Sequence, residues 1–351
     1  MSAQLAVLAA LDWDLPYWAV TLIKVLVAAL LVPTTALILG IVFLFKIMSW
    51  MQSRLGPQEA GPKGLLQLLA DGVKFLQKED VIPERADRFA FKVAPMIVLV
   101  STFLLYVIIP AGPDPAVIAD LPTGIFFALA VSSLSVIGVL MAGWASANKY
   151  ALMGGIRAAG QLIAYELPMV LAVVGVIIQA GTLNMNGIVV AQANFKLFGD
   201  VGPGIPFIIT QLPMFLIFLA AMQAELTQPP FDMPVAESEL VSGYQVEYTG
   251  FRFLFFFLAE FATAFAFGAI ASVLFLGGWY LPGLDVNSEW FWLIGPAVLF
   301  AKIMLVSFLI FWFRFTYPRL REDQLQRLAW KWLIPISLVW LAVTAVFKVV
   351  M

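Results

Sequence analysis

Residues 17–45 read YWAVTLIKVLVAALLVPTTALILGIVFLF and contain a single charged side chain, Lys24. A run of about 20 apolar residues is long enough to cross the roughly 30 Å hydrocarbon core of a bilayer as a helix. Similar runs recur along the whole chain. They predict eight transmembrane spans, at residues 17–45, 89–109, 122–142, 158–180, 205–226, 251–281, 289–313 and 330–350. The first and sixth are longer than a bilayer requires, so we expect them to tilt or to extend beyond it.

The composition agrees with this pattern. Of the 351 residues, 62% are hydrophobic and only 12% are charged, and the mean hydropathy is +0.96. A soluble domain usually has about a quarter of its residues charged. We therefore predict an all-α integral membrane protein, a single polytopic membrane domain over residues 1–351. It should consist of the eight transmembrane helices and a cytoplasmic surface helix.

The sequence contains no Cys and no His. Disulfides, Cys-ligated iron–sulfur clusters, His-ligated haem or zinc and His-dependent nucleophiles are therefore excluded. A net charge of −2 without any basic run gives no indication of a nucleic-acid partner. We expect no catalytic residue and no metal site on this chain, so any redox chemistry that it serves lies on another polypeptide.

Positive charge is unevenly distributed between the predicted loops. Of the 20 Lys and Arg residues, all but four lie in the segments 46–92, 143–157, 227–252 and 314–331. Loops with an excess of positive charge face the cytoplasm. The odd-numbered loops are therefore predicted to be cytoplasmic and both termini to lie on the opposite side. The first of these loops, 46–92, includes an amphipathic segment, Lys63–Lys78, which we expect to lie along the membrane surface.

The loop 227–250 is acidic, although it lies on the positive side. Its acids are Asp232, Glu237, Glu239 and Glu247, and Glu225 stands just before it. A solvated acidic face is one interpretation, but three prolines and several interleaved aromatic and aliphatic residues favour partial burial. If residues 236–248 are helical, Glu239 and Glu247 share one face. Carboxyl groups packed against apolar side chains have raised pKa values, which suits them to carry protons near neutral pH.

Two further acids, Glu166 and Glu260, lie within predicted spans. A charge in hydrocarbon costs at least roughly 2.5 kcal/mol, so such residues are functional candidates. The alternative is a structural ion pair with Lys302 or Arg157, or a protonated acid that makes one hydrogen bond. The residues alone thus indicate either a proton-handling subunit or a small secondary transporter, and the inverted repeat typical of a transporter is not visible in the sequence.

Four groups of motifs carry a more specific resemblance. They read RLGPQEAGPKGLLQ (54–67) with ADGVK (70–74) and KED (78–80); GWASANKY (143–150) with GGIR (154–157) and AYE (164–166); PFDMP (230–234) with ESELVSGY (237–244) and EYTG (247–250); and PRLREDQL (318–325) with WK (330–331). In this order they resemble the four cytoplasmic loops of the quinone-cavity membrane subunit of respiratory complex I, an NADH:quinone oxidoreductase. The likeness extends from about residue 20 to residue 345.

The resemblance implies a membrane subunit that forms part of a quinone-binding cavity and begins the proton path that couples quinone reduction to ion translocation. It implies quinone as a substrate, with iron–sulfur clusters and flavin only in partner subunits. The implied partners are other membrane-arm subunits and the peripheral hydrophilic-arm subunits that carry the terminal iron–sulfur cluster, in a bacterial cytoplasmic membrane or the equivalent organellar membrane.

The resemblance also assigns roles to individual residues. The positions that it implies are Glu166, Glu225, Asp232, Glu237, Glu239, Glu247 and Glu260 for the proton path; Arg54, Asp71 and Phe231 for the quinone cavity; and Gly56, Pro57, Gly61, Pro62, Arg319 and Arg321 for partner docking.

The sequence departs from the family pattern at three places. Leu44 and Phe45 stand where an acid–base pair is usual, Gln228 replaces an Arg, and Val235 replaces a Glu. These departures predict a changed head-group site or a shifted proton path. Two alternatives to the complex I subunit stay open here: the equivalent subunit of a membrane-bound hydrogenase-type complex that does not use quinone, and a stand-alone ion transporter.

Overall fold

The computed structural model describes residues 16–112, 118–196, 204–283 and 291–350, and every regular element in these ranges is helical. The ends of the chain, including the N-terminus that was predicted to be non-cytoplasmic, lie outside the described residues. Seven stretches of the described residues are long and apolar enough to cross a membrane: Trp18–Met51, Arg88–Val107, Gly124–Ala145, Lys149–Ala180, Gly250–Phe275, Ile294–Thr316 and Glu322–Val350. The prediction of an all-α, multi-pass membrane protein is confirmed.

The elements follow the predicted spans closely. The first span is one continuous helix made of α2 (Tyr17–Leu39), the π-helical η1 (Gly40–Ile47) and α3 (Met48–Met51). The others are α5 (Arg88–Val107), α6 (Gly124–Ala145), α7 (Lys149–Ala180), α9 (Leu212–Glu225), α11 (Gly250–Phe275), α12 (Phe291–Thr316) and the C-terminal run of α13 (Glu322–Leu328), η4 (Ala329–Leu333) and α14 (Ile334–Val350).

Several spans differ in length from the prediction: the first runs on to Met51, α11 ends at Phe275 and not at residue 281, and the C-terminal run begins at Glu322 and not at residue 330. Helix α7 begins nine residues before the predicted residue 158, because the Asn148 side chain accepts a hydrogen bond from the Tyr150 amide and caps the helix there. Helix α9 begins at Leu212, with Pro213 in its first turn, and not at residue 205. Its 14 residues rise only about 21 Å, which is less than the hydrocarbon thickness.

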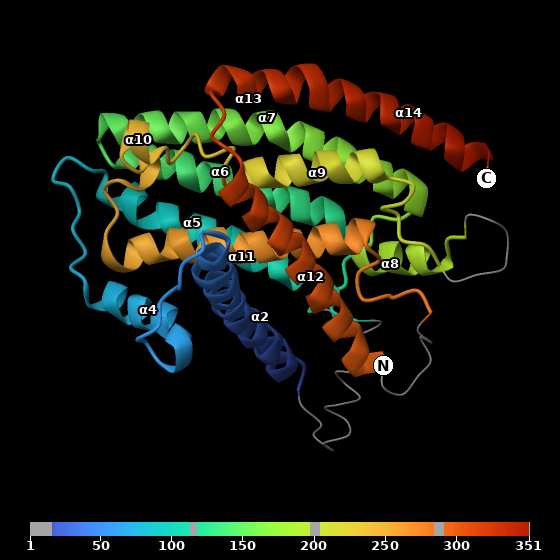
Figure 1. Cartoon of the computed structure of the whole chain (residues 1–351), viewed down its shortest axis with the longest axis horizontal. Helices are drawn as coiled ribbons and strands as arrows, with labels where there is room; N and C mark the ends of the chain where they lie inside the picture. Colours follow the sequence, from blue (N-terminus) through green and yellow to red (C-terminus); the bar gives the residue numbers. More distant parts are fainter. Residues whose placement is uncertain (1–15, 113–117, 197–203, 284–290, 351) are drawn as a thin grey trace.

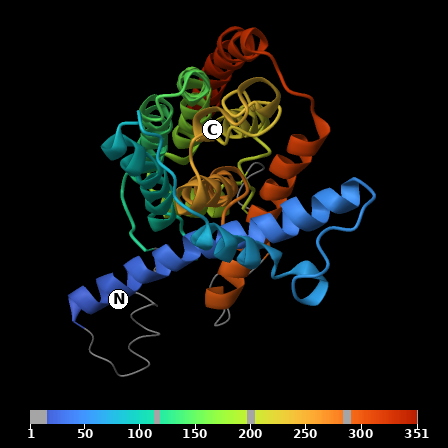
Figure 2. The ribbon, with the colours of Figure 1, turned by 90° about the vertical axis from the view of Figure 1, so that its left-hand side faces the viewer.

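The long helices form a bundle that two of them cross obliquely. Helices α5, α6, α7, α9, α11 and α14 lie side by side in Figure 1, and α2 and α12 run diagonally across them. Figure 2 views several of the bundle helices nearly end-on, with α2 crossing the bundle. The short helices α4 (Gln67–Gln77) and α10 (Glu237–Leu240) lie at one end, and α8 (Met185–Asn194) lies at the other.

Helix α4 is the expected amphipathic segment, although it begins at Gln67. The residues before it, Lys63 and Gly64, have φ values of 52° and 74°, which no α-helix accommodates. The Phe75 ring packs against Phe253 of α11 with centroids 5.5 Å apart. An outer stripe of apolar side chains is exposed and consists of Leu65, Leu66, Leu69, Val73 and Leu76. This stripe suits the membrane surface.

Buried glutamines satisfy the main chain where the bundle helices break. Gln161, Gln192 and Gln223 are fully or almost fully buried. Their side-chain amides donate to carbonyl oxygens at helix ends: Gln161 to Ala224 and Phe231, both at 2.7 Å, Gln192 to Val273 at 2.8 Å and Gln223 to Pro229 at 2.8 Å. Unpaired carbonyls are costly in hydrocarbon, so these amides make the breaks tolerable.

A lysine satisfies the free main-chain carbonyls at the end of α11. The Lys302 ammonium donates to the carbonyl oxygens of Leu276, Gly278 and Tyr280 at 2.6, 2.8 and 2.5 Å. A cation at the C-terminal end of a helix also interacts favourably with the helix dipole. Lys302 is therefore an interhelical cap that ties α12 to the end of α11.

Two adjacent glycines of α7 permit close backbone contacts. A Cβ atom added at Gly154 would lie 2.6 Å from Gly243 Cα and from the Tyr244 amide nitrogen. One added at Gly155 would lie 3.2 Å from Gly143 Cα in α6. The acidic loop packs onto α7 at a position that tolerates no side chain, and α6 packs onto it at one that leaves little room.

We expect Gly154→Ala to lower the free energy of unfolding by about 1–3 kcal/mol, because the new methyl group overlaps the loop backbone. The midpoint temperature of thermal unfolding should fall accordingly. The matched control is Gly72→Ala, since nothing lies within 4 Å of a Cβ atom there. Alanine is the better helix former, so this control should unfold at the same or a slightly higher temperature. Equal midpoints for both variants in detergent would contradict the close contact.

Candidate functional site

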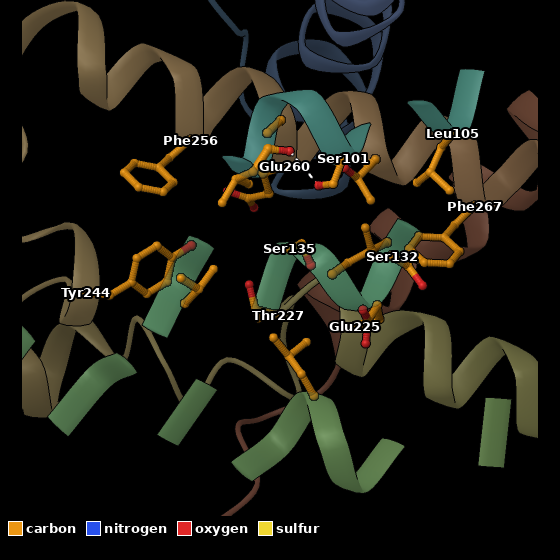
Figure 3. Close-up of a pocket in the computed structure, with 16 residues that line it drawn as sticks. Ser101, Leu105, Ser132, Ser135, Glu225, Thr227, Tyr244, Phe256, Glu260 and Phe267 are labelled. Atoms are coloured by element: carbon orange, nitrogen blue, oxygen red, sulfur yellow. Dashed lines mark hydrogen bonds between the residues drawn. The ribbon is translucent and has the colours of Figure 1, made fainter. Parts of the chain in front are cut away.

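Two of the predicted acids, Glu225 and Glu260, line one cavity of about 60 Å³ between α5, α6, α9 and α11. We call it the carboxylate cavity. In Figure 3, Glu260 of α11 and Glu225 at the end of α9 approach it from different sides. The sequence predicted both acids individually, and the fold brings them to a common space.

Hydroxyl groups line the carboxylate cavity between the two acids. They are those of Ser101, Ser132, Ser135, Thr227, Tyr244 and Thr263. Each hydroxyl can both donate and accept a hydrogen bond. A polar cavity needs only about 10–15 Å³ to hold one water molecule, so this volume suits a few of them. The cavity can therefore hold a short chain of hydrogen bonds from one carboxyl to the other.

Glu225 has no cationic partner among the described residues. Its Oε2 atom is buried and accepts no hydrogen bond from any of them. Glu225 interacts instead with Glu166 on α7, a carboxyl group like itself. Glu166 itself accepts a hydrogen bond from the Ser133 hydroxyl of α6. Glu166 and Glu225 thus form a pair of like groups beside the cavity.

Glu260, in contrast, is held by an amide and a cation. Gln228 Nε2 donates to Glu260 Oε1 at 2.7 Å, and Arg314 Nη1 lies 3.2 Å from the same oxygen. The alternative that Glu260 pairs with Lys302 or Arg157 is wrong, because Lys302 caps α11 and Arg157 binds Glu239 at 2.7 Å. The cation comes instead from the last turns of α12.

The remaining acids lie in the loop at the α10 end of the bundle. Asp232 faces Arg319 at 3.4 Å; burial raises the pKa of Asp232, and Arg319 and Arg314 oppose that rise. Glu239 is 52% exposed, and a hydrogen bond from Arg157 lowers its pKa. Asp232 therefore holds a proton more readily than Glu239 does.

Residues 236–248 do not form a continuous helix, so the condition under which Glu239 and Glu247 would share a face is not met. The segment forms α10, a break at Val241 and Ser242, and the 3₁₀ turn η3 (Gly243–Gln245). The break arises because Gly243, with φ 55°, packs directly onto Gly154 of α7.

Glu239 and Glu247 therefore have separate surroundings. Glu237 is exposed, Glu239 points to Arg157, and Glu247 accepts a hydrogen bond from Asn148 Nδ2 at 2.5 Å.

A wider groove of about 540 Å³ lies between the acidic loop, α7 and α13. Its charged lining residues are Arg157, Glu239, Arg319, Arg321, Glu322 and Asp323. The two arginines predicted for docking differ in environment. Arg319 bridges Asp232 and Glu239, whereas Arg321 is exposed and pairs with Asp323 at 2.9 Å.

The three residues predicted for a quinone cavity do not line the carboxylate cavity. Arg54 is exposed, Asp71 pairs with Lys74 at 3.1 Å on α4, and Phe231 is buried with its ring edge-on to Tyr165. Their role stays a prediction.

The loop over residues 56–62 is tightly packed. A Cβ atom at Gly56 would lie 2.3 Å from the Phe45 carbonyl oxygen, and the Lys46 ammonium donates to the Pro57 carbonyl at 2.8 Å. Its geometry is that of a rigid surface loop.

Sequence reasoning missed two residues of the site, Gln228 and Arg314. Gln228 was noted only because it replaces an Arg of the family pattern. Arg314 was one of several basic residues on the positive side. Arg314 follows directly after the predicted span 289–313, but α12 runs on to Thr316, so the structure places this arginine within the helix. The cavity hydroxyls carried no signal in the sequence.

These observations define a multi-pass helical membrane protein in which buried carboxyl groups share a small hydroxyl-lined cavity. The sequence profile of the family described as NADH dehydrogenase matches residues 23–345. The chain belongs to this family.

Its curated relatives agree in name and extent, and each is an NADH-quinone oxidoreductase subunit of one type, designated H. The relative from Anoxybacillus flavithermus is 48% identical over 312 residues, which are 88% of this chain and 88% of the relative. Those from Brevibacillus brevis and Rhodospirillum rubrum are each 44% identical, over 94% and 87% of this chain and 95% and 87% of their own length.

We expect the Arg157–Glu239 pair to stabilise the fold at neutral pH and to stop doing so in acid. Because the pKa of Glu239 is lowered by folding, its contribution is present above the ordinary carboxyl pKa of about 4.3 and is lost as the pH falls through the lower folded value. At pH 7, Glu239→Gln should cost less than about 1 kcal/mol, as is usual for exposed pairs.

Thermal unfolding at pH 7 and below pH 4 measures this effect. The difference in unfolding midpoint between the wild type and Glu239→Gln should become smaller in acid. The control is Glu237→Gln, whose exposed carboxylate forms no ion pair with another described residue. A gap that widens in acid would contradict the assignment.

Proposed function

We propose that the chain is the membrane subunit of a complex I-type NADH:quinone oxidoreductase and begins the path that couples quinone reduction to proton translocation. The proposal is carried by one observation: Glu225 and Glu260 face the same hydroxyl-lined cavity in a member of the NADH dehydrogenase family. The names of its relatives support the complex and quinone as the substrate. They also favour this function over a hydrogenase-type complex or a stand-alone transporter.

Without Cys or His, the chain has no ligands of its own for iron–sulfur clusters. Flavin and clusters are proposed to lie in the peripheral partner subunits, and the quinone is proposed to bind where those subunits meet this one. Arg54, Asp71 and Phe231 are the residues of this chain proposed to border that shared site. They lie on the first loop, on α4 and at the start of the acidic loop.

The proposed path runs from the acidic loop into the bundle. Glu237, Glu239 and Glu247 would collect protons at the surface, and Asp232, whose pKa is raised by burial, would pass them inward. The carboxylate cavity with Glu260 and Glu225 follows, and Glu166 lies beyond. In a site of low dielectric constant, a charge change at the quinone alters the protonation of acids some distance away.

Partner docking is proposed for the positive end of the bundle, which we place on the cytoplasmic side of a bacterial or equivalent organellar membrane. Two features support it: the rigid loop with Gly56, Pro57, Gly61 and Pro62, and the groove with Arg319 and Arg321. A rigid, charged surface loses little conformational entropy on binding and selects its partner by charge.

We expect Glu225→Gln and Glu260→Gln each to reduce NADH-driven quinone reduction in native membranes by more than tenfold. The first removes a carboxyl group that transfers a proton, which contributes about 10²-fold or more, and the second leaves Arg314 beside the cavity without its carboxylate partner. Assembly should be retained, since glutamine has the same shape. The measurement is quinone reduction per assembled complex, with complex content determined on native gels. The control is Glu84→Gln, an exposed acid. Full turnover in both cavity variants would remove them from the path.

A second test fills the cavity and spares the acids. Ser135→Leu should lower turnover several-fold, because the larger side chain displaces water from a space of only about 60 Å³. Ser135→Ala is the matched control, which removes the hydroxyl but leaves the space. Equal turnover in the two variants would contradict a water-filled connection between Glu225 and Glu260.

A further inference from the structure

Among the described residues, Gln228 forms the only amide bridge between Glu260, which lines the carboxylate cavity, and Arg314. Its side chain is fully buried. Its Nε2 donates to Glu260 Oε1 at 2.7 Å, while its Oε1 accepts from Arg314 Nη1 at 2.6 Å. One amide thus presents its donor to the carboxyl group and its acceptor to the guanidinium.

The direction of the Gln228 amide favours one charge state of Glu260. An amide N–H facing a carboxyl oxygen favours the carboxylate, because a protonated oxygen has a hydrogen of its own to donate. Turning the amide round would place its NH₂ group against Arg314, where donor would face donor. The guanidinium therefore fixes the direction of the amide, and the amide in turn favours ionised Glu260.

Glu225 has neither of these partners. Its Oε2 lacks a hydrogen bond from the described residues, and its interacting neighbour is the acid Glu166. The two carboxyls of one cavity are therefore unequal: one is held by a cation and an amide, and the other is free to exchange a proton with cavity water.

We propose that Gln228 is a positioning residue that keeps Glu260 as the fixed anion of the carboxylate cavity, so that Glu225 is the carboxyl that gains and loses the proton. This inference rests on the proposed function and specifies which acid moves the proton. The charged and titratable groups that face Glu260 are Arg314 of α12, Asp232 of the acidic loop and Tyr244 of η3. Glu225 lies at the same cavity.

The test is the pH profile of NADH-driven quinone reduction by membranes that contain Gln228 variants. If activity requires ionised Glu260, activity is lost at low pH as Glu260 is protonated. The acidic limb of the pH profile then reports the protonation of the Glu260 carboxyl group. Gln228→Met removes the donor and should move that limb upward by about one pH unit or more, the usual effect of losing a hydrogen bond to a charged group. Gln228→Glu should move it upward as well, and Gln228→Lys, which still donates and adds a cation, should move it downward.

Opposite shifts in the Glu and Lys variants support the proposal, because a purely structural role would reduce turnover at every pH. The control is Gln161→Met, which removes a buried amide that binds only main-chain carbonyls. It should lower complex content without shifting the limb. If the charged variants do not assemble, a limb that shifts in Gln228→Met but not in Gln161→Met supports the proposal, and equal limbs overturn it.

Glu260→Gln separates this inference from the proposed function. If Glu260→Gln abolishes turnover while the Gln228 variants leave the limb unmoved, or move it in one direction only, the positioning role fails and the proton path stands. If Glu260→Gln retains full turnover, the path itself fails at this residue.

Discussion

Hydrocarbon offers no hydrogen bonds to a peptide group, so a helix can end inside a bundle only where other groups satisfy its carbonyls. Helix α9 ends at Glu225, and the amides of Gln161 and Gln223 bind the carbonyls that this break leaves free. The break is what makes the site. It turns Thr227 and Gln228 away from helical spacing, so that Thr227 lines the carboxylate cavity beside Glu225 and Gln228 reaches Glu260.

Close packing and ion pairs tie the acidic loop to the rest of the protein. Gly154 admits the backbone of Gly243, Arg157 binds Glu239, and Arg319 bridges Asp232 and Glu239. The groove proposed for docking and the acids proposed to collect protons are therefore built from the same few contacts. A partner that displaced Arg319 would also change the environment of Asp232, whose pKa that arginine helps to hold down.

Hydropathy was sufficient to predict the number and order of the apolar helices, because burial in lipid requires long apolar runs. It could not predict that α9 begins only at Leu212 or that residues 236–248 are broken. The residues before Leu212 bind Gln192 and Phe275, and the broken segment packs onto Gly154, which are all distant in the sequence. The acids themselves stand out in an apolar sequence. Their partners do not: Gln228 and Arg314 lie 32 and 54 residues from Glu260, and only the fold brings them together.

The departures at Gln228 and Val235 can be understood from their surroundings. Val235 packs against an apolar cluster that includes Phe91, Tyr244 and Phe256, where a carboxylate would lack a partner within that cluster. At position 228 a neutral amide meets both Glu260 and Arg314, and a second guanidinium there would face Arg314 directly. Relative to the family pattern, one positive and one negative charge are absent together, so the net charge of the loop is unchanged. Arg314 supplies a cation to Glu260, so the proposed acidic route does not need an arginine at position 228.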